Sequence, residues 1–188
     1  MIPEELKTYQ NQIALKDGTP VWLRPMNSND CETLLQLYST ASDEDVRYLR
    51  DNVRDPAVVR GWCEMLDYER VYPLMAMMDQ RVAGQATLHF GRGPERHLAK
   101  VRIFTAHDFR QHGLGMCMLN VLVGLARKCA LHLLVAEVVT DQTRVIRAFL
   151  GVGFDLCTTL KDYFMLPNGE TRDVAILMLH LRPPDCDF

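Results

Sequence analysis

The chain lacks the features that would place it in a membrane or on nucleic acid. No apolar run approaches the roughly 18 residues that a membrane-spanning helix needs. The 188 residues carry a net charge of −3, so the basic surplus of a general nucleic-acid binder is missing. The N-terminus shows no basic segment followed by an apolar one, the pattern of a secretory signal. We therefore expect a cytoplasmic protein that binds neither nucleic acid nor membrane.

Cysteine pairs with metal-ligand spacing are also missing. None of the six cysteines forms a C-x-x-C pair, and several lie inside periodic apolar runs. In a chain of this length that pattern favours reduced thiols over a disulfide framework or a zinc site. We expect no metal site. The apolar fraction of 48% and the charged fraction of 24% are those of an ordinary globular protein.

What the chain does contain is a regular succession of helix and strand patterns. A hairpin is expected where Asp17-Gly18 separates two apolar runs, and Asn29 with Glu32 reads as a capping box. The expected helices are 29–38, a short one from Ser42, 56–65, 116–129 and 143–152, and the expected strands are 13–15, 21–23, 72–78, 81–90, 98–105, 132–139, 155–166 and 173–181. We expect one domain over residues 12–182, after an arm at 1–11, either a short helix or loose, and before a tail at 183–188.

The most informative stretch is the turn Arg110-Gln111-His112-Gly113-Leu114-Gly115. It lies between an expected strand and an expected helix. The first N–H groups of a helix have no internal partner, and the helix dipole adds about half a positive charge there. Gly113 and Gly115 have no Cβ, so an anion can approach the main chain closely. The order of strand, glycine turn and helix therefore predicts a phosphate site.

Two other glycine motifs do not fit this turn. The dinucleotide fingerprint needs a third glycine where the chain has Met118. A P-loop needs a Lys-Ser or Lys-Thr after the last glycine, and neither follows Gly115. A tight turn that binds nothing is the alternative to the phosphate site.

The turn and its surroundings resemble the GNAT superfamily of acetyltransferases, in which Q/R-x-x-G-x-G/A holds the pyrophosphate of acetyl-CoA. The resemblance continues through 134–142 and through 145–154, which ends in Gly153-Phe154 as the second CoA-side helix of the family commonly does. Upstream, 17–25 and 66–70 are similar to the bacterial protein-lysine acetyltransferase branch, whose domain is often fused to an acyl-CoA synthetase-like part. The similarity covers roughly residues 12–181.

The resemblance implies an α/β fold of the α+β type, with a mixed, mostly antiparallel sheet flanked by helices. Two adjacent strands of this sheet splay apart to admit the co-substrate, acetyl-CoA. By analogy they are the strands ending near Thr105 and beginning near His132. The residues implied to contact acetyl-CoA are Ile103, Phe104, Thr105, Arg110, Gln111, His112, Gly113, Leu114, Gly115, Met116, Gln142 and Phe149.

The sequence departs from the resembled family at both catalytic side chains. In the protein-lysine branch the catalytic glutamate falls ten residues before the first motif residue, where this chain has Lys100, with Ala99 beside it. The tyrosine that often protonates the thiolate is replaced by Phe149, although members of the resembled branch often lack it too. A lysine here would repel a cationic acceptor. It could instead bind an acidic substrate or the phosphates of acetyl-CoA, or be a solvated strand charge.

Other residues could take over proton transfer. Glu137 lies in an apolar strand beside the expected gap, where its pKa could be raised for a general base; a solvated or ion-paired carboxylate is the alternative. His89 could accept a proton or be structural. Glu69 could bind an acceptor amine or be a surface charge, and Cys117 could be a thiolate or a small apolar side chain. We name Glu137 and His89 as the candidate catalytic residues.

These features together predict an N-acetyltransferase that moves an acetyl group from acetyl-CoA to an amine, with a protein lysine favoured. One alternative is a regulatory module that binds acyl-CoA with little or no catalysis, because the family's acid is missing. Another is transfer to a small amine such as a polyamine, an aminoglycoside or an amino acid. A homodimer is compatible with the sequence.

Overall fold

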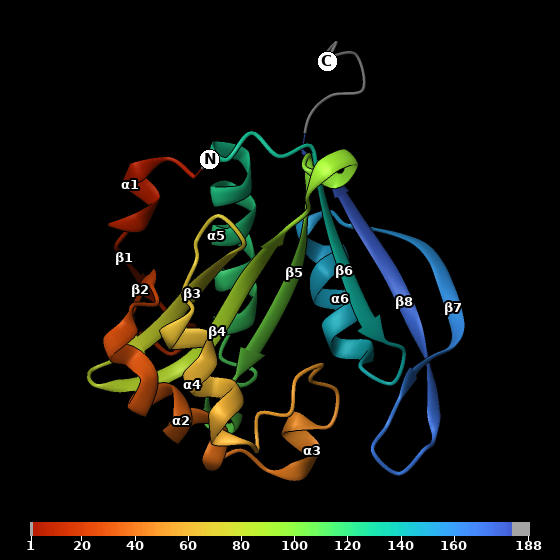
Figure 1. Ribbon diagram of the computed structural model, residues 1–188, viewed down its shortest axis with the longest axis horizontal. Coiled ribbons are helices and arrows are strands. Elements are labelled where there is room, and N and C mark those ends of the chain that lie inside the picture. The colour runs from red at the N-terminus through yellow and green to blue at the C-terminus, as the bar shows by residue number, and fades with distance from the viewer. Residues whose placement is uncertain (1, 182–188) are drawn as a thin grey trace.

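The computed structural model describes residues 2–181 and is built on an eight-stranded mixed sheet with the strand order β1-β2-β3-β4-β5-β6-β8-β7 (Figure 1). The strands are β1 (Asn11–Ala14), β2 (Pro20–Pro25), β3 (Val71–Met78), β4 (Arg81–Phe90), β5 (Leu98–Thr105), β6 (Leu133–Val139), β7 (Asp155–Met165) and β8 (Thr171–His180). The helices are α1 (Glu4–Lys7), α2 (Cys31–Ser39), α3 (Asp43–Val46), α4 (Pro56–Glu64), α5 (Leu114–Lys128) and α6 (Thr143–Val152). The expected fold class is confirmed.

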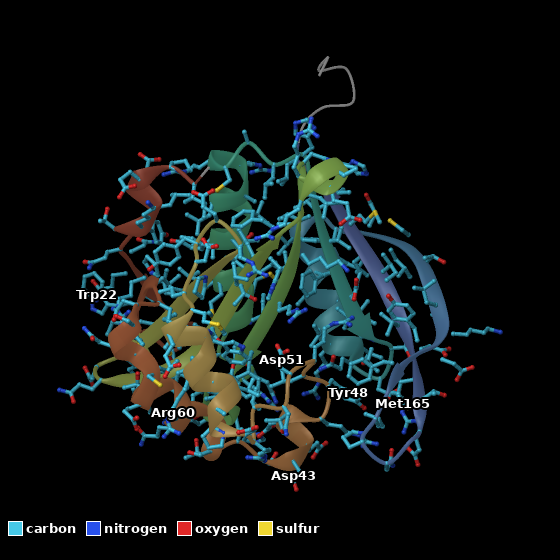
Figure 2. The ribbon with its side chains drawn as sticks, viewed as in Figure 1. Trp22, Asp43, Tyr48, Asp51, Arg60 and Met165 are labelled. Carbon is cyan, nitrogen blue, oxygen red and sulfur yellow. The ribbon has the colours of Figure 1, made fainter. Side chains whose placement is uncertain are left out.

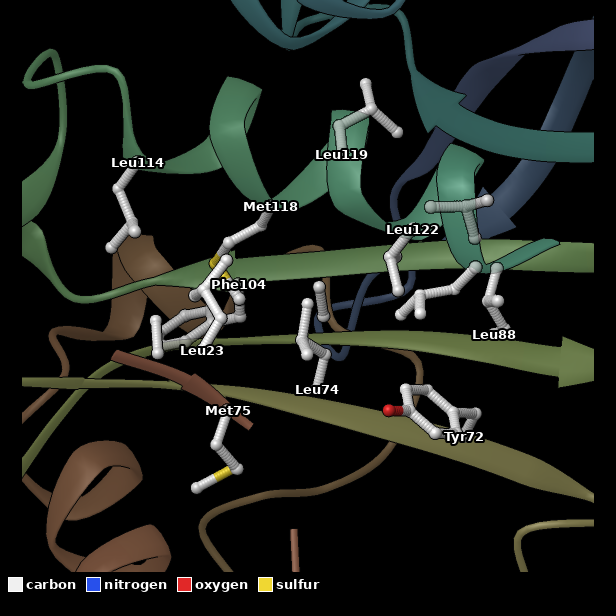
Figure 3. Close-up of a cluster of buried hydrophobic side chains, with 14 of the residues drawn as sticks. Leu23, Tyr72, Leu74, Met75, Leu88, Phe104, Leu114, Met118, Leu119 and Leu122 are labelled. Atoms are coloured by element: carbon white, nitrogen blue, oxygen red, sulfur yellow. The ribbon is translucent and has the colours of Figure 1, made fainter. Parts of the chain in front are cut away.

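The sheet carries helices on both faces. Phe104 of β5 packs its ring 5.1 Å from that of Tyr38 on α2, so α2 and α4 cover this face. The neighbouring Thr105 points to the opposite face, where it lies beside Gly115 of α5. Figure 3 shows Leu114, Met118 and other apolar side chains of α5 packed onto the strands. The predicted apolar stripe of this helix is buried throughout: Leu119, Leu122, Val123 and Ala126.

The segment before α2 corrects one expectation. The capping box is formed by Asn27 and Asp30, which close a single 3-10 turn at Ser28–Asp30 before α2, and not by Asn29 and Glu32. The reason is the set of partners that the Asp30 side chain has. The Asp30 carboxylate is buried and accepts hydrogen bonds at 2.7 Å from both the Asn27 N–H and the Arg24 guanidinium. The short helix expected from Ser42 is α3, capped by Ser42 with Asp45, and the helix expected over 56–65 is α4, capped by Asp55 before Pro56.

The ends of the chain were expected to be an arm and a tail. The short helix expected within residues 1–11 is present as α1, and its Leu6 is buried in the core. Tyr72 anchors this helix, because its hydroxyl donates a 2.8 Å hydrogen bond to the Leu6 carbonyl. The tail predicted at 183–188 lies outside the described residues. Within residues 2–181, no helix combines the length and the apolarity required to cross a bilayer.

The strands β5 and β6 separate as the resemblance implies. They run parallel and pair only where Leu98–Lys100 meet Leu133–Val135. Figure 1 shows them diverging from there toward their carboxyl ends. On the far side, β6 pairs with β8 along its whole length. The sheet therefore stays continuous at one end and opens into a gap at the other, next to the start of α5.

Candidate active site

The backbone of β5 presents donors to this gap. In a strand, the N–H and C=O groups of successive residues point alternately to the two neighbouring strands. The Ala106 N–H donates to the Ala83 carbonyl at 2.9 Å, so even-numbered residues face the β4 side. The His97 carbonyl accepts from the His132 N–H at 2.8 Å, so odd-numbered residues face the β6 side. Since β6 has moved away beyond Lys100, the odd-numbered N–H groups of the later part of β5 point into the gap.

This alternation distinguishes the three β5 residues expected to bind acetyl-CoA by the direction of their N–H groups. Ile103 and Thr105 have odd numbers, so their N–H groups face the gap. Phe104 pairs with Gln85 of β4, and its backbone groups are directed there. Its side chain is buried against Tyr38. A carbonyl oxygen in the gap would therefore accept a hydrogen bond from the N–H of Ile103 or Thr105 and not from that of Phe104.

The turn between β5 and α5 has the geometry of an anion cradle. Gly113 precedes α5 with φ +89°, and Gln111 also has a positive φ of +67°. Leu114 begins the helix, so the N–H groups of Leu114, Gly115 and Met116 have no partner within it. A Cβ placed on Gly115 would meet only the Thr105 methyl group, at 3.9 Å. The space beside Gly115, at the start of α5, is therefore open.

Basic residues lie beside the cradle. The stem of Lys16, from the turn between β1 and β2, lies 3.4 Å from where a Gly113 Cβ would be. Arg110 forms an ion pair with the buried side chain of Asp45 on α3. The His112 ring shares a 2.9 Å hydrogen bond with Asp17, and hydrogen bonds from Thr19 and His112 lower the pKa of Asp17 to about 2. Lys16 was not found from the sequence, because only the fold brings its turn to Gly113.

A cavity of about 430 Å³ lies on the face of β5 that α4 covers. Its floor includes Thr87 and His89 from β4 and Arg102 from β5, which stand side by side because Thr87 pairs with Arg102 in the sheet register. Trp62 of α4 forms part of its wall. Ile103 also borders this cavity. The cavity therefore extends to the part of β5 whose N–H groups face the gap. Its volume is in the range of sites for small molecules.

His89, one of the two candidate bases, lies in this cavity. Its Nε2 is 2.9 Å from the Thr87 hydroxyl oxygen. Burial, with smaller contributions from the positive charges of Arg102 and Lys100, lowers the pKa of His89 to about 4. The imidazole is consequently neutral at pH 7 and has a free lone pair or an N–H, depending on its tautomer.

Glu137, the other candidate base, is held by two cations. Lys100 Nζ lies 2.6 Å from one carboxylate oxygen, and Arg50 from the α3–α4 segment pairs with the other. Burial alone would raise the pKa of Glu137, but the Lys100 hydrogen bond and the charges of Arg50, Lys100 and Arg102 lower it. The raised pKa expected from the sequence is therefore wrong, and the ion-paired alternative is confirmed.

The remaining expected residues lie away from the cavity. Phe149 is buried with its ring 5.0 Å from that of Phe154, so it belongs to the core between α6 and the sheet. Gln142 precedes α6 without capping it through its side chain. Glu69 accepts the Ile2 N–H at 2.9 Å, and Cys117 is half-buried in α5. Among residues 2–181, no group of three or more potential metal-ligating side chains occurs.

Part of the cavity lining has only a weak signal in the sequence. Arg102 lies inside an apolar strand pattern, although its spacing from Lys100 puts the two cations on one face of β5. Asp51 (Figure 2) and Arg50 lie in an irregular segment where no pattern marks them. Only the folded chain brings this segment against β5, where Asp51 lies 3.4 Å from Arg102.

Comparison with known proteins identifies the class. Residues 32–154 match the model of the acetyltransferase (GNAT) family. The chain therefore belongs to this family of enzymes, which use acetyl-CoA as co-substrate. No significant match is found among curated protein sequences.

Solved structures agree with this fold. The GNAT domain of S. lividans PAT is 18% identical with a TM-score of 0.76, the alignment covering 96% of this chain and 99% of that one. The structure of yncA, a putative acetyltransferase from Salmonella typhimurium with its cofactor acetyl-CoA, is 19% identical with a TM-score of 0.76, covering 95% and 98%. A ribosomal-protein-alanine N-acetyltransferase from Brucella melitensis is 23% identical with a TM-score of 0.74, covering 84% and 98%. At such identities the similarity shows the fold alone.

Proposed function

We propose that this chain transfers the acetyl group of acetyl-CoA to an amine held in the cavity beside β5. The observation that carries the proposal is the position of Ile103. Its N–H faces the gap between β5 and β6, and the same residue borders the cavity. A thioester in the gap and an amine in the cavity would therefore meet at one strand.

The pyrophosphate of acetyl-CoA binds at the start of α5. The N–H groups of the first helical turn donate to phosphate oxygens, and Gly113 and Gly115 allow the close approach. Lys16 and Arg110 add positive charge, the latter by exchanging Asp45 for phosphate. The pantetheine then runs into the gap, and Gln111, His112 and Met116 lie along the turn that it passes.

The transfer needs one N–H donor and one proton acceptor. The neutral amine attacks the thioester carbonyl carbon, and the Ile103 N–H donates to the oxygen as negative charge develops on it. The carbon–sulfur bond breaks, and CoA leaves as a thiolate that takes a proton from solvent. The amine nitrogen gives up its extra proton to the neutral His89 ring, which passes it on to water because its conjugate acid is strong.

His89 suits this role better than Glu137. It lines the cavity, whereas both oxygens of Glu137 are engaged by Arg50 and Lys100. We assign Glu137 a positioning role: it holds Lys100 on β5 and Arg50 beside the cavity. The glutamate that the resemblance implies on β5 is thus absent here, and the positively charged Lys100 occupies its position.

The acceptor is a small amine. A cavity of about 430 Å³ suits a metabolite-sized molecule, and Arg102 and Lys100 near His89 disfavour a lysine ammonium. The protein lysine that the resemblance favours is the second candidate, supported by the similarity in fold to the GNAT domain of S. lividans PAT.

The test is a single-turnover assay. The purified protein is mixed with acetyl-CoA and, separately, with lysine peptides, polyamines, aminoglycosides and amino acids, and free thiol and acetylated product are measured. We expect thiol release coupled to acetylation of at least one small amine. Acetyl-CoA binding without acetylation of any amine above the uncatalysed rate would instead favour the regulatory module.

A further inference from the structure

The positive charge of Arg102, which lines the cavity, is only partly neutralised by a nearby carboxylate. Lys100, two residues earlier on the same face of β5, is neutralised by Glu137 at 2.6 Å. Within the described part of the chain, the Arg102 guanidinium has one ion-pair contact, a single 3.4 Å approach to Asp51. Burial also lowers the pKa of Arg102, which shows that desolvation disfavours its charge. A half-buried guanidinium with most of its five donors unused is suited to bind an oxyanion.

A second guanidinium faces the same space. Arg70, just before β3, lines the cavity and forms no ion pair with any residue from 2 to 181. It lies on the other side of β4, since Val71 pairs with His89 and Thr87 pairs with Arg102. The cavity therefore has a cation on each side of the strand that carries the candidate proton acceptor.

We propose that the amine acceptor also carries a carboxylate or a similar oxyanion, and that Arg102, with Arg70, binds this anion while the amine faces Ile103 and His89. The proposal rests on the proposed function and names the chemical class of its acceptor. The arginines that line the cavity, Arg50, Arg70 and Arg102, outnumber its aspartates, Asp51 and Asp67, so an anionic amine compensates an excess of positive charge that a polyamine or a lysine side chain would increase. Nearby cations also lower the pKa of the bound amine, so more of it is in the reactive neutral form.

The alternative is that Arg102 only holds the segment at Asp51. The 3.4 Å contact is longer than a good charge-assisted hydrogen bond, which is about 2.7–2.9 Å. A structural role would make loss of Arg102 cost stability but would leave the choice between charged and uncharged acceptors unchanged. The preference for acceptors, and not activity alone, therefore separates the two roles.

The experiment compares amino acids with their carboxamides, which keep the size and lose the charge. The rates are corrected for the fraction of neutral amine in each acceptor. We expect kcat/KM to favour the acids by about tenfold or more, the usual worth of a hydrogen bond between charged groups. Arg102→Gln should reduce this preference to about twofold or less, and Arg70→Gln should weaken it.

The matched control is Arg60→Gln, because Arg60 is an exposed arginine of α4 outside this cavity (Figure 2). It should leave the preference intact. The thermal midpoint and acetyl-CoA affinity of each variant show whether it is folded. Equal rates for acids and carboxamides in the native protein, or an unchanged preference in Arg102→Gln, would overturn the proposal while leaving acetyl transfer established.

A second measurement applies even without turnover. Calorimetry of the CoA-loaded protein compares binding of an N-acetyl amino acid with binding of its carboxamide. We expect the acid to bind about tenfold more tightly and Arg102→Gln to remove the difference. If no amine is acetylated but the acid still binds selectively, the proposed function fails and the anion site stands. If acid and carboxamide bind equally, the anion site fails.

Discussion

At the scale of single residues, the exchange of an acid for Lys100 on β5 changes the electrostatics of the whole site. Lys100 and Arg50 enclose Glu137, and Arg102 lies close by. The cluster holds three cations and, with Asp51, two carboxylates. The carboxylate beside Lys100 is therefore that of Glu137 on β6, and it is an ion-pair partner.

Glu137→Gln should destabilise the protein in a pH-dependent way. The pKa of Glu137 is lowered in the folded state, so its stabilising contribution is present above the ordinary glutamate pKa of 4.5 and is lost as pH falls through the folded value. At pH 7 the variant should lose about 1 kcal/mol, because its partners are partly exposed. Denaturant unfolding at a series of pH values measures this, and a pH-independent difference would contradict the ion-pair role.

His89→Gln should impair catalysis without impairing acetyl-CoA binding. Loss of the proton acceptor should lower kcat/KM by about 10²–10⁴-fold. His180→Gln, at an exposed histidine near the end of β8, is the matched control. If Glu137→Gln shows the large loss and His89→Gln does not, Glu137, the other candidate from the sequence, is the base and His89 is not.

At the scale of elements, the turn between β5 and α5 uses its two glycines differently. Gly113 has φ +89°, which is strained for any other residue, so a substitution there disturbs the turn itself. Gly115 lies inside α5 and needs no unusual backbone conformation. Because Gly115 has no side chain, space remains at the start of the helix. A substitution at Gly115 therefore tests the anion cradle with less effect on folding.

Gly115→Val should weaken acetyl-CoA binding by at least about tenfold while the protein stays folded, because the side chain occupies the approach to the first-turn N–H groups. Gly124→Val is the matched control: Gly124 is in the same helix and exposed, and nothing lies within 4 Å of its Cβ position. Isothermal calorimetry gives both affinities. Equal affinities would place the phosphates elsewhere.

The segment from α3 to Arg50 links both sides of the gap. Asp45 holds Arg110 of the turn, the Tyr48 hydroxyl donates to Asp141 at 2.9 Å, and Arg50 reaches Glu137 (Figure 2). These contacts join an irregular segment to residues on β6 and after it. The segment is therefore part of the site, although none of its residues lies in the motif.

At the scale of the whole molecule, the two parts of the sheet are joined only by a short pairing between β5 and β6. Three residue pairs join β5 to β6, whereas β6 and β8 pair over seven positions. A ligand in the gap would touch both parts of the sheet. Ligand binding should therefore stabilise the molecule as a unit.

Acetyl-CoA at about a hundredfold excess over its Kd should add about 2.7 kcal/mol to the free energy of unfolding. CoA should compete with acetyl-CoA, since both carry the pyrophosphate, and NAD should not bind comparably because the dinucleotide fingerprint is incomplete. Thermal unfolding with each ligand measures this. Comparable stabilisation by NAD would contradict the acetyl-CoA cradle.

The sequence by itself determined the elements and their order. The bounds of β4, β5 and α6 agree with the predicted ranges, because period-2 and period-3.6 patterns, caps and turn glycines act over a few residues. It also located the glycine turn before α5, because the expectation of a phosphate site there rests on six consecutive residues. The capping box at Asn29 failed because Arg24, six residues before Asp30, and the Asn27 N–H both bind the Asp30 carboxylate.

Only the tertiary structure decided the catalytic side. The pKa of Glu137 depends on Arg50 and Lys100, and that of His89 on burial and on Arg102. These neighbours come from different strands and from an irregular segment, and no local pattern records their distances. Burial and charge are sums over the whole neighbourhood of a group, so the fold must bring that neighbourhood together before the chemistry of the site is defined.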